Sequence, residues 1–433
     1  MTQIKTKTLN DVCELIVDCE HKTAPIQAIG YPSIRTPNIG KGRLILDNVN
    51  RVSEETYKAW TKRAIPQGGD LILAREAPIG NVAIIPNKVK VCLGQRTVLI
   101  RADKNKVEPN YLVYLLLGEE IQGKILSVSN GATVHHLNMK DIRNLELPKL
   151  PSLHTQRKIA AILSAYDDLM ENNTRRIEIL EEMARSIYRE WFVKFRFPGH
   201  GQVQMVDSEL GLIPEGWEVL PIDELIKRGI LEKNQDGNHG EKHPKSTDYV
   251  PSGIPFIMAK DLSANIIDLH NCQFISSEQA QSLRVGFAKT GDVLLTHKAT
   301  MGRVAIVPKV ESFIVLTPQV TYFRIKNYSS LNQAFLYCTF TSDRFQDILS
   351  GQSDQSTRKF ISITNQRNIK ILYPSPNWIN KFGEIIKDVL GLKESLYSKN
   401  LNLRKTRDLL LPRLISGEID VENFDIHTGE IAA

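Results

Sequence analysis

The 433-residue sequence lacks long apolar runs and paired cysteines, and each absence excludes a class of protein. No stretch of about 18 apolar residues could span a membrane, and the start, MTQIKTKTLNDV, lacks the apolar stretch of a secretory signal. We therefore expect a cytoplasmic protein without membrane contact. The five cysteines form no C-x-x-C pair, so we expect buried free thiols rather than a zinc site or a disulfide framework.

Catalytic signatures are also missing. The chain has no G-x-x-x-x-G-K-[ST] loop to hold a nucleotide. It has neither the glycine-rich turn for a methyl donor nor the Asn/Asp-Pro-Pro-aromatic segment of adenine and cytosine methyltransferases. Intrinsic ATP-driven motion and methyl transfer are therefore not expected.

One segment of the chain occurs twice. GDLILAREAPIGNVAIIP at 69–86 returns as GDVLLTHKATMGRVAIVP at 291–308, an offset of 291 − 69 = 222, with nine of eighteen positions identical. Unrelated sequences would match at roughly one position, so the chain contains two copies of one module. Gly80 and Gly302 fall at the turn of this segment, where a positive φ is expected. The alignment extends to two more polar positions, pairing Gln95 with Gln319 and Arg101 with Arg324.

Each copy combines short strands with a long terminal helix. Apolar spacings of three and four predict that helix, and the globular part is expected to be mixed α/β (α+β). The predicted strands lie at 70–74, 81–85 and 97–101, and the predicted short helices at 109–117, 138–143 and 332–341.

These patterns divide the chain into six segments. They are a first globular domain at 1–152, a central long helix at 153–196, a linker at 197–219, a second globular domain at 220–376, a C-terminal long helix at 377–418 and a tail at 419–433. Pro412 is expected to kink or end the second helix. The short acidic tail is expected to be poorly ordered.

The positive charge of the chain is concentrated in its first part. Residues 1–155 carry 21 basic and 15 acidic side chains, and 21 − 15 = +6 equals the net charge of the whole chain. Such a balance permits a polyanionic partner but does not prove one, because many soluble enzymes have a similar charge.

Asp70 and Asp292, at equivalent places of the repeat, could serve either metal-dependent catalysis or a turn. Nuclease chemistry needs clustered carboxylates, but Glu76, near Asp70, is replaced by Lys298 in the second copy. A shared reaction does not exchange a carboxylate for an amine. We therefore interpret both aspartates as residues that fix the turn before a strand.

Two places in each copy present polar side chains suited to DNA, namely the loop before residues 138–143, with its counterpart in the second copy, and the turn of the repeated segment. A constant frame with exchanged polar tips is what sequence readout requires, since these side chains distinguish base edges. An ordinary solvated loop is the alternative. The candidate DNA-binding residues are Arg75, Arg96, His135, His136, Asn138, Lys140, His297, Lys298, Arg303, Arg358 and Lys359. The adjacent histidines lack a third ligand at suitable spacing, so no metal is expected.

An apolar cluster closes the first long helix at residues 187–197. Its side chains point around much of the helix, so one partner helix cannot cover them all. Either a separate subunit or packing against the second domain must bury the remainder. The candidate partner-binding residues are Ile187, Trp191, Phe192, Leu403, Leu410 and Leu414.

Specific strings in the chain match a known family. NGATVHHLNMKDIRNLELPKLP leads into the first long helix, and SIYREWFVKFRFPGHG closes it before GLIPEGWEV. Together with the duplication, these strings resemble the specificity (S) subunit of type I restriction-modification systems over essentially the whole chain. The approach to the second helix, PSPNWINKFGEII, departs from the proline-rich, glutamate-glutamine entry that is usual in the family.

The resemblance implies a fold and a set of partners. Each globular domain would be a target recognition domain that reads one half of a bipartite, asymmetric site in double-stranded DNA. The two long helices would pack as an antiparallel coiled coil, with pseudo-twofold symmetry, and a forty-residue helix would span about 60 Å. Two modification (methyltransferase) subunits and the restriction (motor-nuclease) subunits would carry S-adenosylmethionine, ATP and Mg, with no cofactor and no catalytic residue in this chain.

Three classes of function make different demands on this sequence. A non-catalytic DNA reader needs the duplication and the exchanged tips, which are present. A self-sufficient nuclease or methylase needs catalytic motifs, which the sequence lacks. A coiled-coil adapter would explain the helices but not the paired globular domains. The sequence favours the DNA reader.

Overall fold

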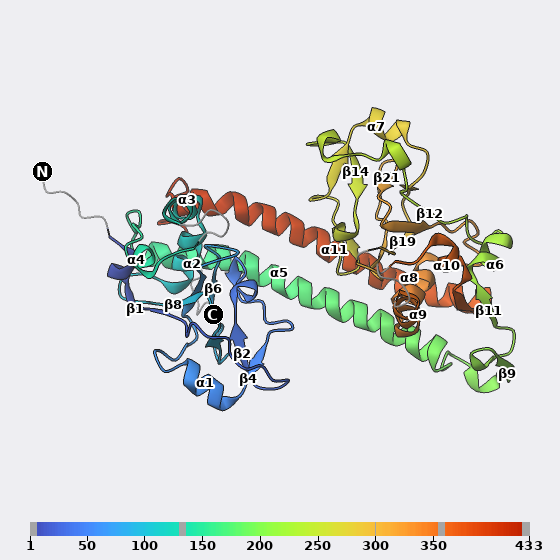
Figure 1. Cartoon of the computed structure of the whole chain (residues 1–433), viewed down its shortest axis with the longest axis horizontal. Helices are drawn as coiled ribbons and strands as arrows, with labels where there is room; N and C mark the ends of the chain where they lie inside the picture. Colours follow the sequence, from blue (N-terminus) through green and yellow to red (C-terminus); the bar gives the residue numbers. More distant parts are fainter. Residues whose placement is uncertain (1–6, 130–135, 299, 354–359, 427–433) are drawn as a thin grey trace, which may run out of the picture. The chain divides into compact units, whose positions relative to one another are not determined.

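The computed structural model describes residues 7–129, 136–298, 300–353 and 360–426, which belong to two compact units (Figure 1). The first unit comprises residues 1–172 and 399–433, and the second comprises residues 173–398. Each unit therefore contains one copy of the repeated module together with a part of each long helix. The duplication predicted from the sequence is present as a duplicated mixed α/β fold.

The first unit is built around a five-stranded sheet. Its strand order is β1 (Cys13–Asp18), β8 (Thr97–Ala102), β5 (Leu71–Ala74), β6 (Val82–Ile84) and β3 (Gly42–Arg43), with β3 parallel to β6 and the other pairs antiparallel. A smaller sheet contains β4 (Arg51–Val52), β2 (Tyr31–Ile34) and β7 (Cys92–Leu93). The helices of its globular part are α1 (Glu54–Trp60), α2 (Pro109–Leu117), α3 (Glu119–Val128) and α4 (Met139–Arg143).

Strand β5 shows why this segment reads as a buried strand. All four of its residues are buried, and alternate side chains enter different cores. Leu71 and Leu73 join the core cluster under helix α2, whereas Ile72 and Ala74 join a cluster on the other face of the sheet. A side-chain period of two with apolar residues at every position is the pattern of a strand covered on both faces.

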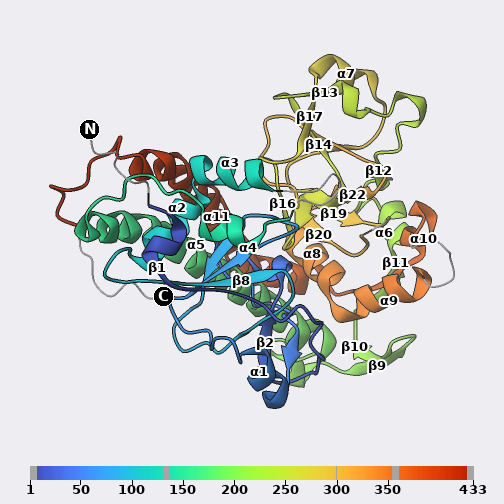
Figure 2. The same cartoon turned by 60° about the vertical axis from the view of Figure 1, so that its left-hand side comes forward.

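The second unit repeats this plan. Its four-stranded sheet has the order β12 (Gln235–Asp236), β22 (Val320–Phe323), β19 (Val293–Thr296) and β20 (Val304–Ile306), so β22, β19 and β20 correspond to β8, β5 and β6. A five-stranded sheet contains β13 (Tyr249–Val250), β17 (Gln273–Ile275), β14 (Ile254–Ile257), β21 (Ile314–Leu316) and β18 (Phe287–Ala288). Figure 2 shows helix α7 (Ser277–Ser282) at the end of this sheet.

Short elements complete the second unit. They are the hairpin β9 (Met205–Ser208) with β10 (Gly211–Pro214), the pair β11 (Glu218–Pro221) with β23 (Lys370–Tyr373), the hairpin β15 (Leu262–Ser263) with β16 (Ile266–Ile267), and helices α6 (Ile222–Lys227), α8 (Gln333–Thr341), α9 (Asp343–Ser353) and α10 (Ile363–Asn368).

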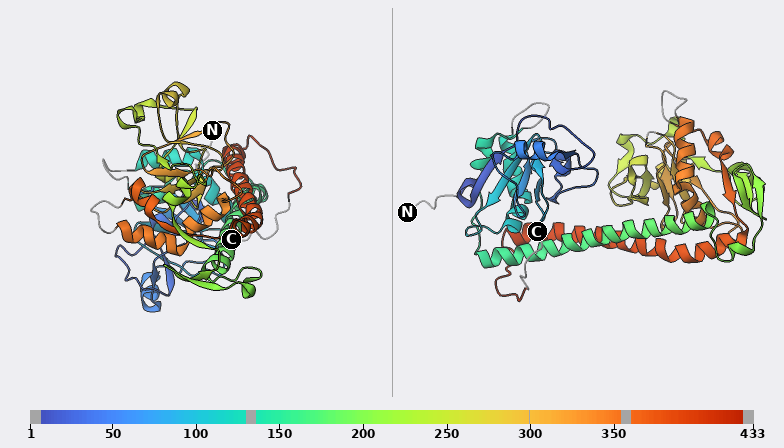
Figure 3. Two further views of the ribbon diagram at one scale, coloured as in Figure 1. Left: turned by 90° about the vertical axis from the view of Figure 1, so that its right-hand side faces the viewer. Right: turned by 90° about the horizontal axis from the view of Figure 1, so that it is seen from below.

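The two long helices run in opposite directions within each unit (Figure 3). Helix α5 spans Leu153–Tyr188 and continues as a π-helical turn at Arg189–Val193, and helix α11 spans Pro376–Ile415. In the first unit the Asn400 side chain donates to the Met170 carbonyl at 3.1 Å. In the second, Lys393 forms a buried ion pair with Glu181. Helix α11 contains Pro412 and ends three residues after it.

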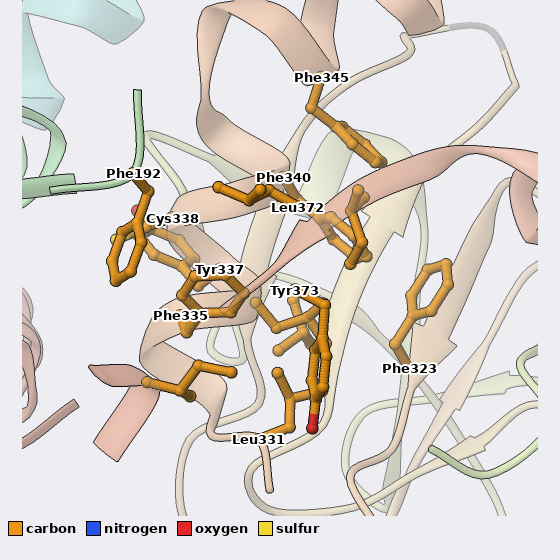
Figure 4. Close-up of a cluster of buried hydrophobic side chains, with 14 of the residues drawn as sticks. Phe192, Phe323, Leu331, Phe335, Tyr337, Cys338, Phe340, Phe345, Leu372 and Tyr373 are labelled. Atoms are coloured by element: carbon orange, nitrogen blue, oxygen red, sulfur yellow. The ribbon is translucent and has the colours of Figure 1, made fainter. Parts of the chain in front are cut away.

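An aromatic core fills the second unit beside the end of helix α5 (Figure 4). The Phe192 ring lies 5.0 Å from the rings of both Phe335 and Phe382 and 5.7 Å from that of Trp217. Phe197 stacks on Trp217 at 5.0 Å. The segment at 197–219, predicted as a linker, therefore contributes a hairpin and core side chains to this unit.

The tail differs from the expectation of poor order over its described part. Val421 is buried, and the Lys158 ammonium donates to the carbonyl oxygens of Glu422 and Phe424 at 2.7 and 2.8 Å. Composition alone could not reveal these contacts, because their partner lies more than 260 residues away in the sequence. Residues 418–426 are thus packed against helix α5.

The five cysteines are free thiols, as the sequence predicts. Cys19, Cys92, Cys272 and Cys338 are buried and Cys13 is half-buried. Burial raises the pKa of the Cys338 thiol to about 12. Every helix in the described part of the chain falls short of the apolar length needed to cross a membrane.

Candidate nucleic-acid interface

Four side chains of the first unit meet where strand β5 ends and strand β8 begins. Arg75 and Glu76 directly follow β5, Arg96 directly precedes β8, and His136 lies before helix α4. The Arg75 backbone N–H donates to the Arg96 carbonyl at 2.9 Å, and the Leu137 N–H donates to the Arg75 carbonyl at 3.1 Å. We call Arg75, Glu76, Arg96 and His136 the first tip.

A chain of hydrogen bonds orders the first tip. Arg75 Nη2 contacts His136 Nε2 at 2.8 Å, and His136 Nδ1 contacts Glu76 Oε1 at 2.8 Å. Because a guanidinium only donates, His136 Nε2 accepts, and its Nδ1–H donates to Glu76. The second carboxylate oxygen of Glu76 lies 2.9 Å from Arg96 Nε. The Arg96 side chain is 60% exposed, so the chain of bonds ends at the surface.

Four different side chains occupy the equivalent positions of the second unit. His297 and Lys298 follow β19, Gln319 precedes β22, and Phe360 lies before helix α10. The His297 N–H donates to the Gln319 carbonyl at 2.9 Å, as Arg75 does to Arg96. We call His297, Lys298, Gln319 and Phe360 the second tip.

The strand register corrects one residue of the sequence alignment. β5 pairs Ala74 with Thr97, and β19 pairs Thr296 with Val320. Gln319 is therefore the counterpart of Arg96 and not of Gln95. Gln95 and Gln319 were paired because they are identical, but the loop before this strand is one residue longer in the second copy. The two glutamines therefore occupy different positions.

A duplicated ion pair lies at the opposite end of the same strands from each tip. Arg101 donates to both carboxylate oxygens of Asp70 at 2.8 and 2.7 Å, and Arg324 donates to both oxygens of Asp292 at 2.9 and 2.7 Å. Each aspartate also accepts the backbone N–H three residues earlier, at 2.9 and 2.7 Å. The interpretation of both aspartates as turn-fixing residues is confirmed by these bonds.

A duplicated glutamine holds the turn of each repeated segment. Gln122 Nε2 donates to the carbonyls of Gly80 and Leu116 at 3.0 and 2.7 Å. Gln346 makes the same two bonds, at 2.9 Å to Gly302 and 2.6 Å to the carbonyl six residues before it. The predicted positive φ is present at both glycines, +80° and +82°. We call the four turn and glutamine residues and the two Asp–Arg pairs the frame.

The frame and the tips differ in how the two copies compare. All four frame positions carry the same residue type in both units, whereas all four tip positions carry different types. The backbone geometry is therefore repeated while the chemistry that it presents is exchanged. Such a separation is what a surface needs if each copy is to bind a different sequence of hydrogen-bonding groups.

The predicted DNA-binding residues fall into three groups. Arg96, Asn138 and Lys140 are exposed, and His136 and Lys298 are partly exposed. Arg75, His297 and Arg303 instead use their side chains within the unit. His135, Arg358 and Lys359 lie outside the described residues. Direct contact with DNA stays a prediction for all of them.

Arg75 and His297 are the buried members of the two tips, and like Arg303 they bond to backbone carbonyls within their unit. Arg75 Nε donates to the Leu137 carbonyl at 2.8 Å, and His297 Nδ1 contacts the Ile361 carbonyl at 2.9 Å. Arg303 donates to the carbonyls of Ala259 and Leu262 at 3.2 and 2.7 Å. Burial lowers the pKa of His297, which keeps its imidazole neutral. Arg75 and His297 thus tie each tip to the loop before the next helix.

Glu76, Gln319 and Phe360 are members of the tips that are absent from the candidate DNA-binding residues. Glu76 lies at the turn of the repeated segment, beside the candidate Arg75, and the one-residue difference between the loops hid Gln319. A signal for Glu76 was available, because its exchange for Lys298 reverses the charge at one position of the repeated segment. Among the described residues, no three His, Cys, Asp or Glu side chains gather in a way that could hold a metal ion.

The predicted partner-binding residues are largely packed within the units. Phe192 and Leu414 are buried at 3% and 2% exposure, and Ile187, Trp191 and Leu410 are partly buried against the same cores. Leu403 is also partly buried. Packing within the chain, the alternative left open by the sequence, covers most of the apolar cluster, although Val193 stays 54% exposed. A docking role for these residues stays a prediction.

Comparison with known proteins gives matches over nearly the whole chain. The family described as "Type I restriction modification DNA specificity domain" matches residues 1–182 and 214–397. The chain is 28% identical to the type I restriction enzyme MjaIX specificity subunit of Methanocaldococcus jannaschii, over 86% of this chain and 82% of that protein. It is 22% identical to the type I restriction enzyme EcoBI specificity subunit of Escherichia coli, over 93% and 84% respectively.

A solved structure has a similar fold. The S subunit of a type I restriction-modification system from M. genitalium superposes with a TM-score of 0.57 at 15% sequence identity, covering 96% of this chain and 97% of that one.

Proposed function

The chain belongs to the family of type I restriction-modification DNA specificity subunits, and from this premise we propose that its two tips are the surfaces that read DNA. The chain is a DNA-recognition subunit of a restriction-modification system. The first tip would read one half of a bipartite, asymmetric site, and the second tip the other half. The single observation that supports this assignment is the identity of the frame beside the complete exchange of the tips.

The assignment explains why one fold is used twice in one chain. Base edges in the major groove differ in their pattern of donors and acceptors, so a reader changes its specificity by changing side chains while its backbone stays fixed. The exposed Arg96 offers guanidinium donors in the first copy, because both ring nitrogens of His136 are bonded within the tip. In the second copy Lys298 offers an ammonium, Gln319 an amide and Phe360 only apolar surface. Two unlike half-sites follow from two unlike tips.

Catalysis would reside on partner subunits. We propose that two modification subunits supply S-adenosylmethionine and the methylating site, that restriction subunits use ATP and Mg²⁺, and that this chain performs no chemistry. The sequence lacks the motifs for these activities, and the residues conspicuous for their charge are accounted for by turn-fixing and tip-ordering bonds. Among the residues that the structure describes, no group of His, Cys, Asp and Glu that could hold a catalytic metal favours a self-sufficient nuclease.

The test is a binding selection with the full-length chain, alone and together with its modification subunits. Duplexes with two randomised blocks separated by spacers of several lengths would be incubated with protein, and bound DNA would be sequenced. We expect enrichment of one motif with two unlike specified blocks. Enrichment of a single continuous block, or of none, would refute the proposal that two tips read two half-sites. Cleavage or methylation by the isolated chain would refute its non-catalytic role.

A further inference from the structure

Arg96 is held in a conformation that presents its guanidinium away from the protein. It has a φ of +68°, which is uncommon for a residue with a side chain, and it is exposed between the buried strand β8 and the buried Gly94. Its Nε is engaged by Glu76 at 2.9 Å, while no bond of its two terminal nitrogens to another described group is present. A guanidinium anchored through Nε keeps both terminal nitrogens available as a fork.

The second copy changes both members of this pair together. Glu76 is replaced by Lys298, and Arg96 is replaced by Gln319. A lysine beside an arginine would repel it, so either exchange alone would remove the contact that orients Arg96. The backbone bond beneath the pair is nevertheless the same in both copies, 2.9 Å from Arg75 N–H to Arg96 O and 2.9 Å from His297 N–H to Gln319 O.

From this geometry we infer that the position shared by Arg96 and Gln319 determines specificity, with Arg96 reading a guanine in the first half-site and Glu76 acting as its positioning residue. The inference rests on the proposed function and deepens it. An arginine fork matches the O6 and N7 acceptors of guanine, and a glutamine amide matches the N7 acceptor and N6 donor of adenine. Gln319 Oε1 accepts the Ala259 backbone N–H at 3.4 Å, which leaves one lone pair of this oxygen and the Nε2 donor for a base. The exchange of Arg96 for Gln319 therefore predicts a change from guanine to adenine between the two half-sites.

Glu76 acts on the base only through Arg96. Its carboxylate is 16% exposed and binds two groups at once, Arg96 through one oxygen and His136 through the other. Since the buried Arg75 in turn donates to His136, the orientation of the carboxylate is fixed by groups of the tip before DNA arrives. Such preorganisation reduces the conformational entropy that Arg96 loses when it binds a base.

The experiment uses the full-length chain co-purified with its modification subunits and the same randomised duplex pool. The variants are Arg96→Gln, which copies the second unit, and Arg96→Lys, which keeps the charge and loses the fork. We expect both to reduce the preference for guanine at one position of one half-site by about 5- to 150-fold, and to leave the other half-site unchanged. Arg96→Gln should gain a preference for adenine at that position.

A matched control variant is Lys88→Gln. Lys88 is also basic, exposed and in the left-handed region, with a φ of +66°. It lies after the end of strand β6 that is farther from the first tip. It should leave the motif unchanged. Glu76→Ala should relax the same guanine position as Arg96→Gln, and Glu76→Gln, which keeps an oxygen acceptor, should retain part of the preference. A merely structural role of Glu76 would weaken all sequences equally.

The outcomes separate this inference from the proposed function. If the parent complex enriches a bipartite motif and Arg96→Gln enriches the same bases, the inference is wrong and the proposed function stands. If the parent complex enriches no bipartite motif, both the proposed function and the inference that rests on it are wrong. Thermal unfolding of each variant would exclude misfolding, and no loss of stability is expected at the exposed side chains of Arg96 and Lys88.

Discussion

Replacing Phe192 by alanine distinguishes a core residue from a docking residue. The Phe192 side chain is 3% exposed and contacts the rings of Trp217, Phe335 and Phe382 at centroid distances of 5.7, 5.0 and 5.0 Å. A buried phenylalanine truncated to alanine typically costs about 3 to 5 kcal/mol, because the lost burial is joined by a cavity that the surroundings fill only partly. We therefore expect a large loss of stability of the second unit.

The size of the thermal shift follows from the size of that unit. It contains 398 − 173 + 1 = 226 residues. Domains of this size lose about 2 to 4 °C in melting temperature for each kcal/mol, so the expected shift is about 6 to 20 °C. Calorimetry of the full chain should show the transition of the second unit moving down while that of the first unit stays in place.

Val193→Ser is the matched control for this prediction. Val193 is the next residue along the same helical turn and is 54% exposed, so its replacement should change stability by less than about 0.5 kcal/mol. Both variants would also be tested for co-purification of the modification subunit. A Phe192→Ala chain that melts like the parent but no longer binds the subunit would show that Phe192 is a docking residue and that its assignment to the core is mistaken. An exposed docking residue could be replaced without loss of stability, whereas we expect the replacement of Phe192 to lower stability.

Three further predictions concern the frame, the histidines and the backbone of DNA. Gln122→Ala and Gln346→Ala each remove two partly buried hydrogen bonds, so each should cost about 1 to 3 kcal/mol in urea unfolding and impair only the half-site of its own unit. Equal loss at both half-sites would contradict the division of labour. Burial lowers the pKa values of His239 and His243 in the folded second unit, so these histidines take up protons on unfolding when the pH is below about 6.5. The second unit should therefore lose stability as the pH falls from 7.5 to 5.5. An equal loss in a variant with phenylalanine at both positions would assign the effect to other groups. If the exposed Lys140 contacts a phosphate, Lys140→Gln should weaken binding to all sequences and reduce the slope of log binding constant against log salt concentration by about 0.9. An unchanged slope with an altered base preference would show that Lys140 contacts a base instead.

The sequence predicted the regular elements because their signals are local. The strand expected at 97–101 is observed as Thr97–Ala102, and the helix expected at 109–117 as Pro109–Leu117. Both carry an uninterrupted apolar pattern bounded by turn residues, and the duplication supplied each signal twice. The turn roles of Asp70 and Asp292 were predictable for the same reason, since an aspartate that directly precedes the strand appears at the same offset in both copies.

The remaining features depend on partners distant in the sequence. Whether Arg75 faces solvent or the protein is decided by the Leu137 carbonyl, 62 residues later. The aromatic cluster around Phe192 could be assigned to a subunit or to the second domain only once Phe335 and Phe382 were placed beside it. Composition and periodicity report the need for burial but not the surface that provides it.

The first unit is assembled from both ends of the polypeptide, and this has a consequence for synthesis at the ribosome. Residues 173–398 form a unit that is complete in itself, whereas residues 1–172 lack Leu414, Val421 and the carbonyls that bind Lys158 until the last part of the chain has emerged. Domains generally fold as units during translation. The unit whose synthesis begins first is therefore the last to complete its folding, because its core includes residues translated after the second unit. A premature stop near residue 400 would leave the second unit intact and the apolar face of the first exposed.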